Sequence, residues 1–291
     1  MKVIFIGVVE FSAKALEKLI KLNVDIVGVV TKKNSQVNSD FIDLSSIARE
    51  NNISYLYMDS INDKNVVEWI KYKNPDFIFC FGLSQIIKKE ILNIAPVIGY
   101  HPAKLPQNRG RHPLIWALVL GLEKSASTFF FMDEGADSGD ILSQKEFEIK
   151  YEDDAKSLYE KVTNIALKQI EEFILQLQNK TYRRIKQDHS KANYWRKRTF
   201  KDGIIDFRMN SYAIYNLVRG LTKPYIGASI IYNDMEIKIW KVKEEKYDLK
   251  NIEPGKILEI KNNTILVKCY NGAIRILEHE FQKLPNIGEY L

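Results

Sequence analysis

Apolar and polar residues alternate in blocks along the first half of the chain. Strand-like apolar runs at residues 3–6 and 26–30 flank a segment, residues 13–22, whose apolar positions have helical spacing. Further apolar runs, separated by helix-like segments, lie at residues 77–81, 97–98 and 128–132. This order predicts an α/β fold with a mostly parallel sheet covered on both faces, and it places a ligand at the carboxyl ends of the strands.

The pattern changes in the second half. A long helix is expected from Glu152, because acidic residues in its first turn precede an apolar stripe of helical spacing. The polar segment 179–198 is typical of a linker. Short strand-like runs follow at residues 204–207, 230–232, 237–242, 257–260, 265–270 and 274–277. We therefore expect a first domain at residues 1–180, a linker at 181–200 and a small β-rich domain at 201–291.

The composition is that of a globular protein with a net positive charge. Its 291 residues are 45% apolar, enough for a sizeable core, and the formal net charge of +6 favours an anionic partner such as tRNA, a nucleotide or polyglutamylated folate. Cys80 and Cys269 lie far apart in apolar runs, as buried free thiols do. The first apolar run is too short for a signal peptide or an anchor, so we expect a cytoplasmic protein without a membrane partner.

The segment 99–121, GYHPAKLPQNRGRHPLIWALVLG, carries the first candidate chemistry. His101 stands between a strand end and two prolines, on a rigid extended loop where an imidazole can face a cleft. It is a candidate general acid, or an electrophile that stabilises an oxyanion. Arg109 and Arg111 precede the positive pole of a short helix that Pro113 begins, which makes this turn a plausible anion site.

The segment 128–141, TFFFMDEGADSGDI, carries the second. It predicts a buried strand that runs into an acidic loop, whose glycines allow backbone amides to approach a ligand closely. Asp137 stands among small residues, the setting expected for a carboxylate with one fixed position, and it is the candidate partner of His101. Gly7 lacks a GxGxxG context, so a nicotinamide or flavin cofactor is not indicated.

Together the two segments resemble the formyltransferase family that includes methionyl-tRNA formyltransferase, glycinamide ribonucleotide transformylase and the sugar N-formyltransferases. The stretches KDGIIDF and NLVRGLTKPYIGA resemble the C-terminal extension of this family, so the resemblance spans nearly the whole chain. It implies a Rossmann-like catalytic domain followed by a small β-rich, OB-like domain. The residues that match the family motif are His101, Pro102, Leu105, Pro106, Arg109, Gly110, Asp137 and Gly139.

One position departs from the family motif. The family has an Asn two residues before the histidine, where it helps to hold the oxyanion, and this chain has Gly99. Losing one oxyanion donor typically costs about two to three orders of magnitude in rate. Either another donor replaces it, with Asn108 or Gln107 as candidates and Tyr100 as a weaker one, or the chain has lost activity. The retained His101 and Asp137 argue against an inactive protein.

The resemblance implies attack of an amine on the formyl carbon of N10-formyl-tetrahydrofolate as co-substrate, without a metal. His101 would stabilise the oxyanion, while Asp137 would orient His101 and help to move a proton. In the family, main-chain groups of two loops hold the pterin ring. These loops map onto Phe81, Gly82, Leu83, Ser84, Gln85, Ile86, Gly135, Ala136 and Asp140.

The acceptor amine is expected to belong to an amino sugar, nucleotide-linked and used in surface-glycan biosynthesis. Methionyl-tRNA formyltransferases usually carry a basic insertion after the second strand, but the corresponding segment here is short and has only Lys32, Lys33 and Arg49 as basic residues. Nucleic acid is therefore not the expected partner, and a homodimer is left open. Candidate substrate contacts, each equally explained as turn or capping structure, are Glu10, Ser12, residues 38–43, Arg109, Arg111 and His112.

Three alternatives remain open from the sequence. The first is methionyl-tRNA formyltransferase. The second is a non-catalytic folate-binding or scaffold protein, motivated by Gly99. The third makes the C-terminal domain a nucleic-acid module of oligonucleotide-binding type, using Tyr232, Trp240 and Tyr270, although core packing is the commoner use of aromatic residues at strand positions.

Overall fold

The computed structural model describes residues 1–35 and 39–291, and these form two compact units. The first unit contains Met1–Pro113, Ser125–Phe147 and Glu160–Trp195. The second unit contains Leu114–Lys124, Glu148–Tyr159 and Arg196–Leu291. Among the described residues, no helix combines the length and the apolar character needed to cross a membrane.

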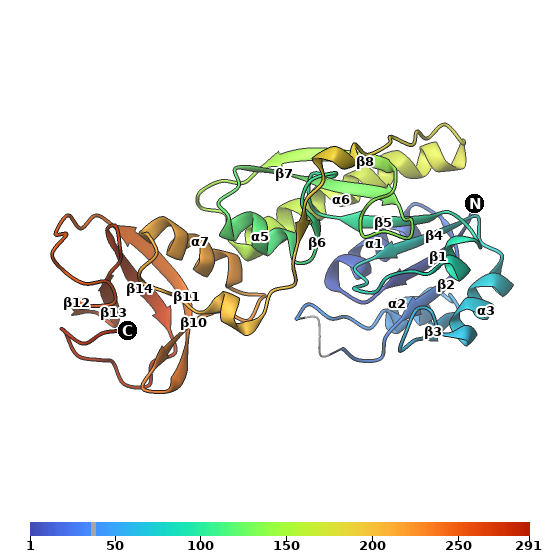
Figure 1. Ribbon diagram of the computed structural model, residues 1–291. Coiled ribbons are helices and arrows are strands. Elements are labelled where there is room, and N and C mark those ends of the chain that lie inside the picture. Colours follow the sequence, from blue (N-terminus) through green and yellow to red (C-terminus); the bar gives the residue numbers. More distant parts are fainter. Residues whose placement is uncertain (36–38) are drawn as a thin grey trace. The chain divides into compact units, whose positions relative to one another are not determined.

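A seven-stranded sheet forms the centre of the first unit, in the order β3-β2-β1-β4-β5-β7-β8 (Figure 1). The strands β1 to β5 pair in parallel, and β7 pairs antiparallel with β5. The predicted α/β sheet is therefore confirmed. Its strands are β1 (Lys2–Gly7), β2 (Asp25–Thr31), β3 (Tyr55–Tyr57), β4 (Phe77–Phe81), β5 (Val97–His101), β7 (Lys124–Phe131) and β8 (Ile141–Glu148).

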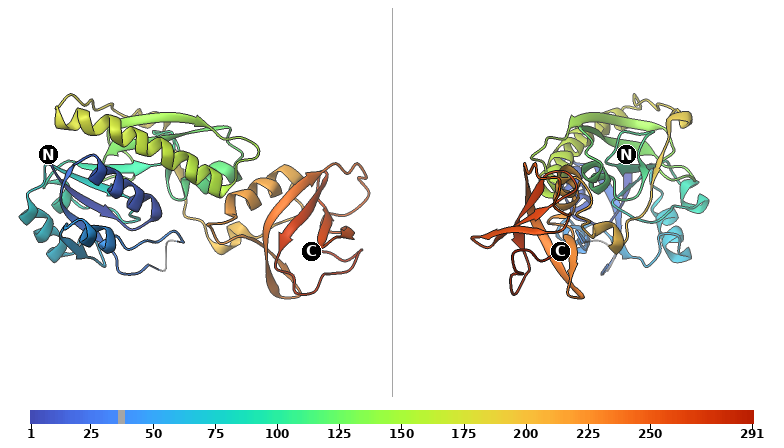
Figure 2. Two further views of the ribbon diagram at one scale, coloured as in Figure 1. Left: turned by 180° about the vertical axis from the view of Figure 1, so that it is seen from behind. Right: turned by 60° about the vertical axis from the view of Figure 1, so that its left-hand side comes forward.

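Aromatic rings join the helices to this sheet. Phe11 of α1 (Glu10–Lys21) packs on Phe81, and Phe173 of α6 (Ala155–Gln178) contacts Phe79 and Phe129 edge-on. Phe81 stacks on Phe79 and contacts Phe129 edge-on, so the three rings form one cluster. Helices α1 and α6 therefore cover the same face of the sheet, where Figure 2 shows them side by side. The first unit also contains α2 (Ser45–Glu50), α3 (Lys64–Lys73) and α4 (Lys89–Leu92), whereas α5 (Pro113–Val119) belongs to the second unit from Leu114 on.

The long helix α6 begins three residues later than expected. Asp154 accepts a hydrogen bond from the Ser157 N–H, and Asp153 accepts one from the Lys150 N–H. Both carboxylates thus satisfy free backbone donors at the helix entrance instead of lying in the first turn. Most of the predicted apolar stripe is buried, including Leu158, Val162, Ile170, Phe173 and Ile174.

The second unit contains a five-stranded antiparallel sheet in the order β10-β11-β14-β13-β12. A predicted strand at 204–207 is wrong, since Ile204 forms only an isolated bridge with Ser229. Ile205 and Phe207 are buried in the core cluster that α7 (Ser211–Leu221) also lines. The strands are β10 (Ala228–Tyr232), β11 (Met235–Glu245), β12 (Ile257–Lys261), β13 (Thr264–Lys268) and β14 (Ala273–His279).

Much of the segment expected to be a linker belongs to the first unit. Strand β9 (Tyr194–Trp195) pairs in parallel with β6 (Arg109–Gly110), and Ile185 exchanges backbone hydrogen bonds with Ile141. We call residues 185–195 the strap. It includes the short helix η1 (His189–Lys191), and a second such helix, η2 (Phe200–Gly203), follows in the second unit.

Candidate active site

His101 and Asp137 come together at the carboxyl ends of the central strands. His101 is the last residue of β5, and Asp137 lies in the loop between β7 and β8. Their Nδ1 and Oδ2 atoms are 3.5 Å apart, with side chains 6% and 20% exposed respectively. The position is the one where ligands bind in open α/β sheets.

Both ring nitrogens of His101 face hydrogen-bond acceptors. Nε2 lies 2.7 Å from the backbone oxygen of Asn108, and Nδ1 faces the carboxylate of Asp137. A neutral imidazole has one N–H and can donate to one of these groups, whereas an imidazolium donates to both. The site therefore places an oxygen atom beside each ring nitrogen, and the one beside Nε2 is within hydrogen-bond distance.

The loop that carries Asp137 is fixed by backbone geometry. Asp137 has a φ of 54°, and its Oδ2 accepts a hydrogen bond from the Gly110 N–H at 2.9 Å. A Cβ atom at Gly139 would lie 1.8 Å from the Phe131 backbone oxygen, so the loop can pass the strand end only without a side chain. Asp133 accepts hydrogen bonds from the Gly135 N–H and the Ser138 hydroxyl, which closes the turn.

Asn108 lies on the opposite side of His101 from Asp137. Its φ of 62° is left-handed, a conformation that Asn tolerates, and its N–H donates to Asn193 Oδ1 at 2.8 Å. The residue is half-buried. Among residues 1–35 and 39–291, no partner binds its side-chain amide, which leaves this amide available to a ligand.

The space beside Gly99 is filled. A Cβ atom at Gly99 would lie 2.8 Å from Met132 Cγ and 3.0 Å from both Met132 Sδ and Phe130 Cζ. Met132 itself packs against Leu105, Phe130 and Ile141. An amide side chain at position 99 would therefore require Met132 to move.

Tyr100 is not placed to replace an oxyanion donor. Its hydroxyl lies 3.1 Å from Ser127 Oγ, and its ring packs between Phe11 and Phe129. Burial raises the pKa of the Tyr100 hydroxyl above its ordinary value. Gln107 is exposed, and Asn108 is the candidate that lies directly against His101.

The loop after β4, predicted to contact the pterin, is braced by its own side chains. Gln85 accepts a hydrogen bond from the Ile61 N–H through Oε1 and donates to the Asp59 carbonyl through Nε2. The Phe81 carbonyl accepts the Ser12 hydroxyl at 2.5 Å. Ile86 is 66% exposed, so the loop presents an apolar side chain to solvent. Gly82 and Leu83 are half-buried, and Ser84, Gly135 and Ala136 are exposed.

Main-chain groups of this region are partly used within the protein. The Ser84 carbonyl accepts from Arg111 Nη1 at 3.3 Å, and the Asp140 carbonyl accepts from the Phe131 N–H at 2.8 Å. Arg111 thus connects the turn after β6 to the predicted pterin loop. Direct contact of these residues with a folate stays a prediction.

The candidate substrate contacts separate into two groups. Ser12 is fully buried and Arg109 is 2% exposed, so neither side chain reaches the surface as a substrate contact requires. Glu10, Arg111 and His112 are half-buried; Glu10 pairs with Lys14 at 2.6 Å, and His112 has a left-handed φ of 55°. Their roles stay predictions. Asn38, the first residue of the predicted contact segment 38–43, lies outside the described residues.

Sequence reasoning missed the strap. Gln187 of this segment donates through Nε2 to the backbone oxygens of Asp137 and Gly139, at 2.9 and 2.6 Å. Asn193 accepts from the N–H of Asn108 through its side chain. Polar side chains that bind backbone groups leave no hydrophobic period, so the sequence offered no signal for them.

The aromatic residues considered for nucleic-acid binding in the second unit have acidic neighbours. Tyr232 donates to Glu289 at 2.6 Å, and Trp240 Nε1 donates to Glu280 at 2.9 Å. Tyr270 is 76% exposed. Carboxylates at two of the three rings would repel a phosphate backbone.

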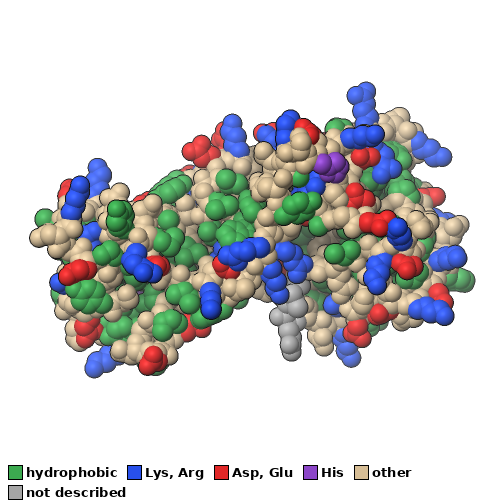
Figure 3. Space-filling model, viewed as in Figure 1, with side chains coloured by type: hydrophobic (Ala, Val, Ile, Leu, Met, Phe, Trp, Pro, Cys, Tyr) green, Lys and Arg blue, Asp and Glu red, His purple; other side chains and the backbone are tan. Residues whose placement is uncertain are grey.

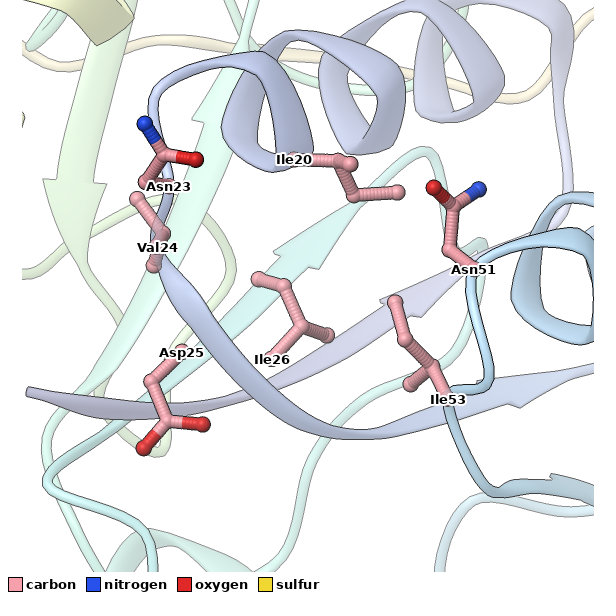
Figure 4. Close-up of a pocket in the computed structure, with 7 residues that line it drawn as sticks. All are labelled: Ile20, Asn23, Val24, Asp25, Ile26, Asn51 and Ile53. Carbon is pink, nitrogen blue, oxygen red and sulfur yellow. The ribbon is translucent and has the colours of Figure 1, made fainter.

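A pocket of about 320 Å³ lies at the other end of the sheet (Figure 4). Asp25 begins β2, whereas His101 ends β5. Because these strands run parallel, the pocket lies at their amino ends and the candidate site at their carboxyl ends. The lining of the pocket mixes aliphatic and polar residues, with no histidine or cysteine: Ile20, Asn23, Val24, Asp25, Ile26, Asn51 and Ile53. Among the described residues, no cluster of His, Cys, Asp and Glu side chains is arranged to hold a metal ion.

Known proteins share both the sequence and the fold. The family model described as formyl transferase matches residues 1–174, and the model of the formyl transferase C-terminal domain matches residues 197–288. A methionyl-tRNA formyltransferase from Caldanaerobacter subterraneus subsp. tengcongensis is 31% identical over 100% of this chain and 96% of its own length. The bifunctional polymyxin resistance protein ArnA of Wigglesworthia glossinidia brevipalpis is 32% identical over 97% of this chain and 43% of its own length.

A solved structure has the same fold. It is the N-formyltransferase from Helicobacter canadensis in complex with folinic acid and dTDP-3-aminofucose, with a TM-score of 0.72 and 21% identity, covering 96% of this chain and 100% of that one. At this identity the likeness shows the fold alone. The two family models together cover almost the entire chain. The chain therefore belongs to the formyl transferase family, and it is an enzyme that transfers a one-carbon formyl group.

Proposed function

We propose that this chain transfers the formyl group of N10-formyl-tetrahydrofolate to a primary amine at His101 and Asp137. The observation that carries the proposal is the His101–Asp137 contact at the carboxyl end of the sheet, 3.5 Å between Nδ1 and Oδ2. In the reaction, the amine nitrogen bonds to the formyl carbon and the bond from that carbon to N10 breaks. The proton lost by the amine is gained by the departing nitrogen.

His101 stabilises the negative charge that develops on the formyl oxygen. Its Nε2 lies 2.7 Å from the Asn108 carbonyl oxygen, and the formyl oxygen would have to take the place of this carbonyl to receive the Nε2–H bond. The Asp137 carboxylate stabilises a protonated imidazole and holds its orientation. Gly110, which donates to the same carboxylate oxygen, keeps Asp137 in place.

Asn108 supplies the amide donor that Gly99 lacks. The volume next to Gly99 is occupied by Met132 and Phe130, so a donor cannot come from that side. The side-chain amide of Asn108 lies on the residue that directly contacts the histidine ring. A donor at the oxyanion is worth about two to three orders of magnitude in rate.

The folate lies against the loops after β4 and β7. Two features support this placement. The Asn62 and Gln85 side chains brace the loop after β4 through backbone groups, and Gly139 lets the loop after β7 pass close to the Phe131 backbone. Exposed Ile86 provides apolar surface for an aromatic ring. The similar structure from Helicobacter canadensis contains folinic acid, which supports a folate donor.

For the acceptor we favour an amino sugar, because the segment after β2 offers few cationic side chains for the many phosphates of a tRNA. Phe41 of this segment forms a bridge with Val9, and the Glu10 N–H donates to the Asp40 carbonyl, so the described part folds back onto the end of β1. Asp43 accepts from the Tyr57 hydroxyl at 2.8 Å. On the first unit, Figure 3 shows basic and acidic side chains interspersed.

Methionyl-tRNA is the second candidate acceptor, and the names of the sequence relatives support it better than an amino sugar. Several relatives called methionyl-tRNA formyltransferase match all of this chain at 31–32% identity. A tRNA would need phosphate contacts outside the segment after β2, where Lys32 and Lys33 are the basic residues before Asp40.

One assay separates the acceptors. Purified protein is incubated with N10-formyl-tetrahydrofolate and either dTDP-3-aminofucose or methionyl initiator tRNA, and formylated product is measured by mass spectrometry. Sugar formylation at a rate at least tenfold above the tRNA rate supports the proposal. Preferred formylation of tRNA, with a rate that falls steeply with salt, would replace it with the second candidate. Folate binding without turnover on either acceptor would favour a non-catalytic binding protein.

A further inference from the structure

We propose that the strap, residues 185–195, completes the active site, and that its Gln187 is a positioning residue for Asp137. The proposal rests on the function proposed above. Gln187 is buried, with 6% exposure, and its Nε2 donates to the backbone oxygens of both Asp137 and Gly139. These two bonds hold the turn in which Asp137 has its left-handed φ of 54°.

Arg109 fixes the orientation of the Gln187 amide. The guanidinium donates to Gln187 Oε1 through Nε at 3.2 Å and through Nη2 at 2.7 Å. Because Oε1 faces the cation, the amide nitrogen must face the two carbonyls. Arg109 thereby connects the turn that contacts His101 to the turn that carries Asp137.

The other partners of Arg109 also belong to the strap. Nη1 donates to the Tyr194 hydroxyl at 2.9 Å, and Nη2 lies 3.1 Å from His189 Nδ1. These groups and Gln187 carry no formal negative charge, so the interaction is a set of hydrogen bonds without a carboxylate. This buried cation therefore depends on the strap for its hydrogen-bond acceptors.

The strap holds the His101 side of the site as well. Asn193 accepts the N–H of Asn108 through Oδ1 at 2.8 Å and the N–H of Arg109 through its carbonyl at 3.0 Å. The Trp195 carbonyl accepts the N–H of Arg111 at 3.0 Å. The strap thus binds the turn beside His101 and the turn that carries Asp137. It therefore sets the distance between these two side chains.

The strap lies between the two matched family models, which end at residue 174 and begin again at residue 197. Its contacts nevertheless reach the residues beside His101 and Asp137. A misplacement of about 1 Å in a reacting group can lower a rate by about 10²-fold. The strap is therefore expected to affect the turnover rate more than the binding of the folate.

The test is Gln187→Glu, which keeps an acceptor for Arg109 and removes the donor to the Asp137 and Gly139 carbonyls. We expect kcat to fall by about 10- to 100-fold, with a change of less than threefold in KM for N10-formyl-tetrahydrofolate. The carboxylate partner that Arg109 gains stabilises the fold and the two carbonyls that lose their donor destabilise it, so the melting temperature is measured to show that the variant is folded. Lys186→Ala, an exposed neighbour on the strap, should leave both constants unchanged.

Asn193→Ala is the second variant, in case Gln187→Glu does not fold, since Asn193 is exposed. It should lower kcat without changing the KM for the folate. Wild-type kcat in the folded variants, or a loss that only follows the fraction of unfolded protein, would overturn the positioning role.

Hydrogen exchange separates this inference from the proposed function. In Gln187→Glu the amides of residues 135–141 should exchange at least tenfold faster than in the wild type, whether or not an acceptor is known. Faster exchange in the variant, with no turnover by the wild type, would support the positioning role of the strap and contradict the proposed function. Unchanged exchange in this loop, with an active wild type, would overturn the strap alone.

Discussion

At the scale of single residues, the candidate site depends on what faces the ring of His101. The motif around His101 and Asp137 could be recognised in the sequence, and the structure brings the two side chains together. The consequence of Gly99 could not be predicted, because it depends on how Met132 packs. Likewise, the burial of Arg109 and Ser12 follows from tertiary partners that lie 69 to 85 residues away.

The proposed role of Asn108 predicts a difference between two substitutions. Asn108→Gly keeps access to the left-handed backbone and removes the amide, and Asn108→Asp keeps the shape but replaces the donor with a carboxylate. We expect kcat to fall by about 10²-fold in both, with unchanged melting temperatures. Steady-state kinetics and thermal denaturation check this. Full activity in Asn108→Gly would remove Asn108 from the mechanism.

The packing beside Gly99 predicts that two positions are coupled. Gly99→Asn alone should destabilise the protein by about 1–3 kcal/mol, because its Cβ would lie 2.8 Å from Met132 Cγ. Adding Met132→Ala makes room, so the double variant should be more stable than the sum of the single effects allows. A double-mutant cycle measured by chemical denaturation tests the coupling. Additive effects would show that Met132 does not fill this space in solution.

At the scale of elements, apolar runs predicted strands that the protein buries and failed where polar side chains decide the structure. The runs at 77–81 and 128–132 correspond to β4 and β7. The run at 204–207 buries Ile205 and Phe207 without forming a strand, because burial alone does not distinguish a strand from an extended segment. The strap resembled a linker because polar side chains hold it in place, and their hydrogen bonds leave no periodic pattern of apolar residues in the sequence.

Helix α7 offers a test of an element that periodicity did not identify. Its N-cap, Asn210, accepts the Ala213 N–H through its side chain at 2.7 Å. Asn210→Ala should therefore lower the free energy of unfolding by about 1 kcal/mol, while Asn210→Asp should be nearly neutral. Urea denaturation measures both. Equal stability of the Ala variant and the wild type would mean that this cap contributes nothing.

At the scale of the whole molecule, the sequence predicted two domains, and the structure assigns more of the chain to the second unit. Leu114–Lys124 and Glu148–Tyr159 belong to it, although both precede the predicted boundary. Ile115 lies in the core cluster with Ile214 and Leu217. The assignment of these two segments to the second unit depends on contacts between residues far apart in the sequence, which the pattern of consecutive residues does not reveal.

Carboxylates of the second unit predict how stability depends on pH. Hydrogen bonds from Arg208 and Arg275 lower the pKa values of Asp206 and Glu245, and a bond from the Tyr232 hydroxyl lowers the pKa of Glu289 to about 2. Since a lowered folded-state pKa stabilises the fold above the unfolded value of about 4, this contribution is lost as pH falls through the folded values. The melting temperature should therefore drop by several degrees between about pH 5 and pH 2. Solvent screening limits the size of the effect because these groups are only half-buried. An unchanged melting temperature over this range would contradict it.

The most direct test of the proposed His101–Asp137 site is a single-turnover measurement of formyl transfer from N10-formyl-tetrahydrofolate to the accepted amine. We predict that His101→Ala and Asp137→Asn each lower the rate of the chemical step by about 10²- to 10⁴-fold. His279→Ala, a histidine of the second unit whose Nε2 lies 2.9 Å from the Asn263 carbonyl, should keep the wild-type rate. Rates within twofold of the wild type in folded His101→Ala and Asp137→Asn would contradict the account.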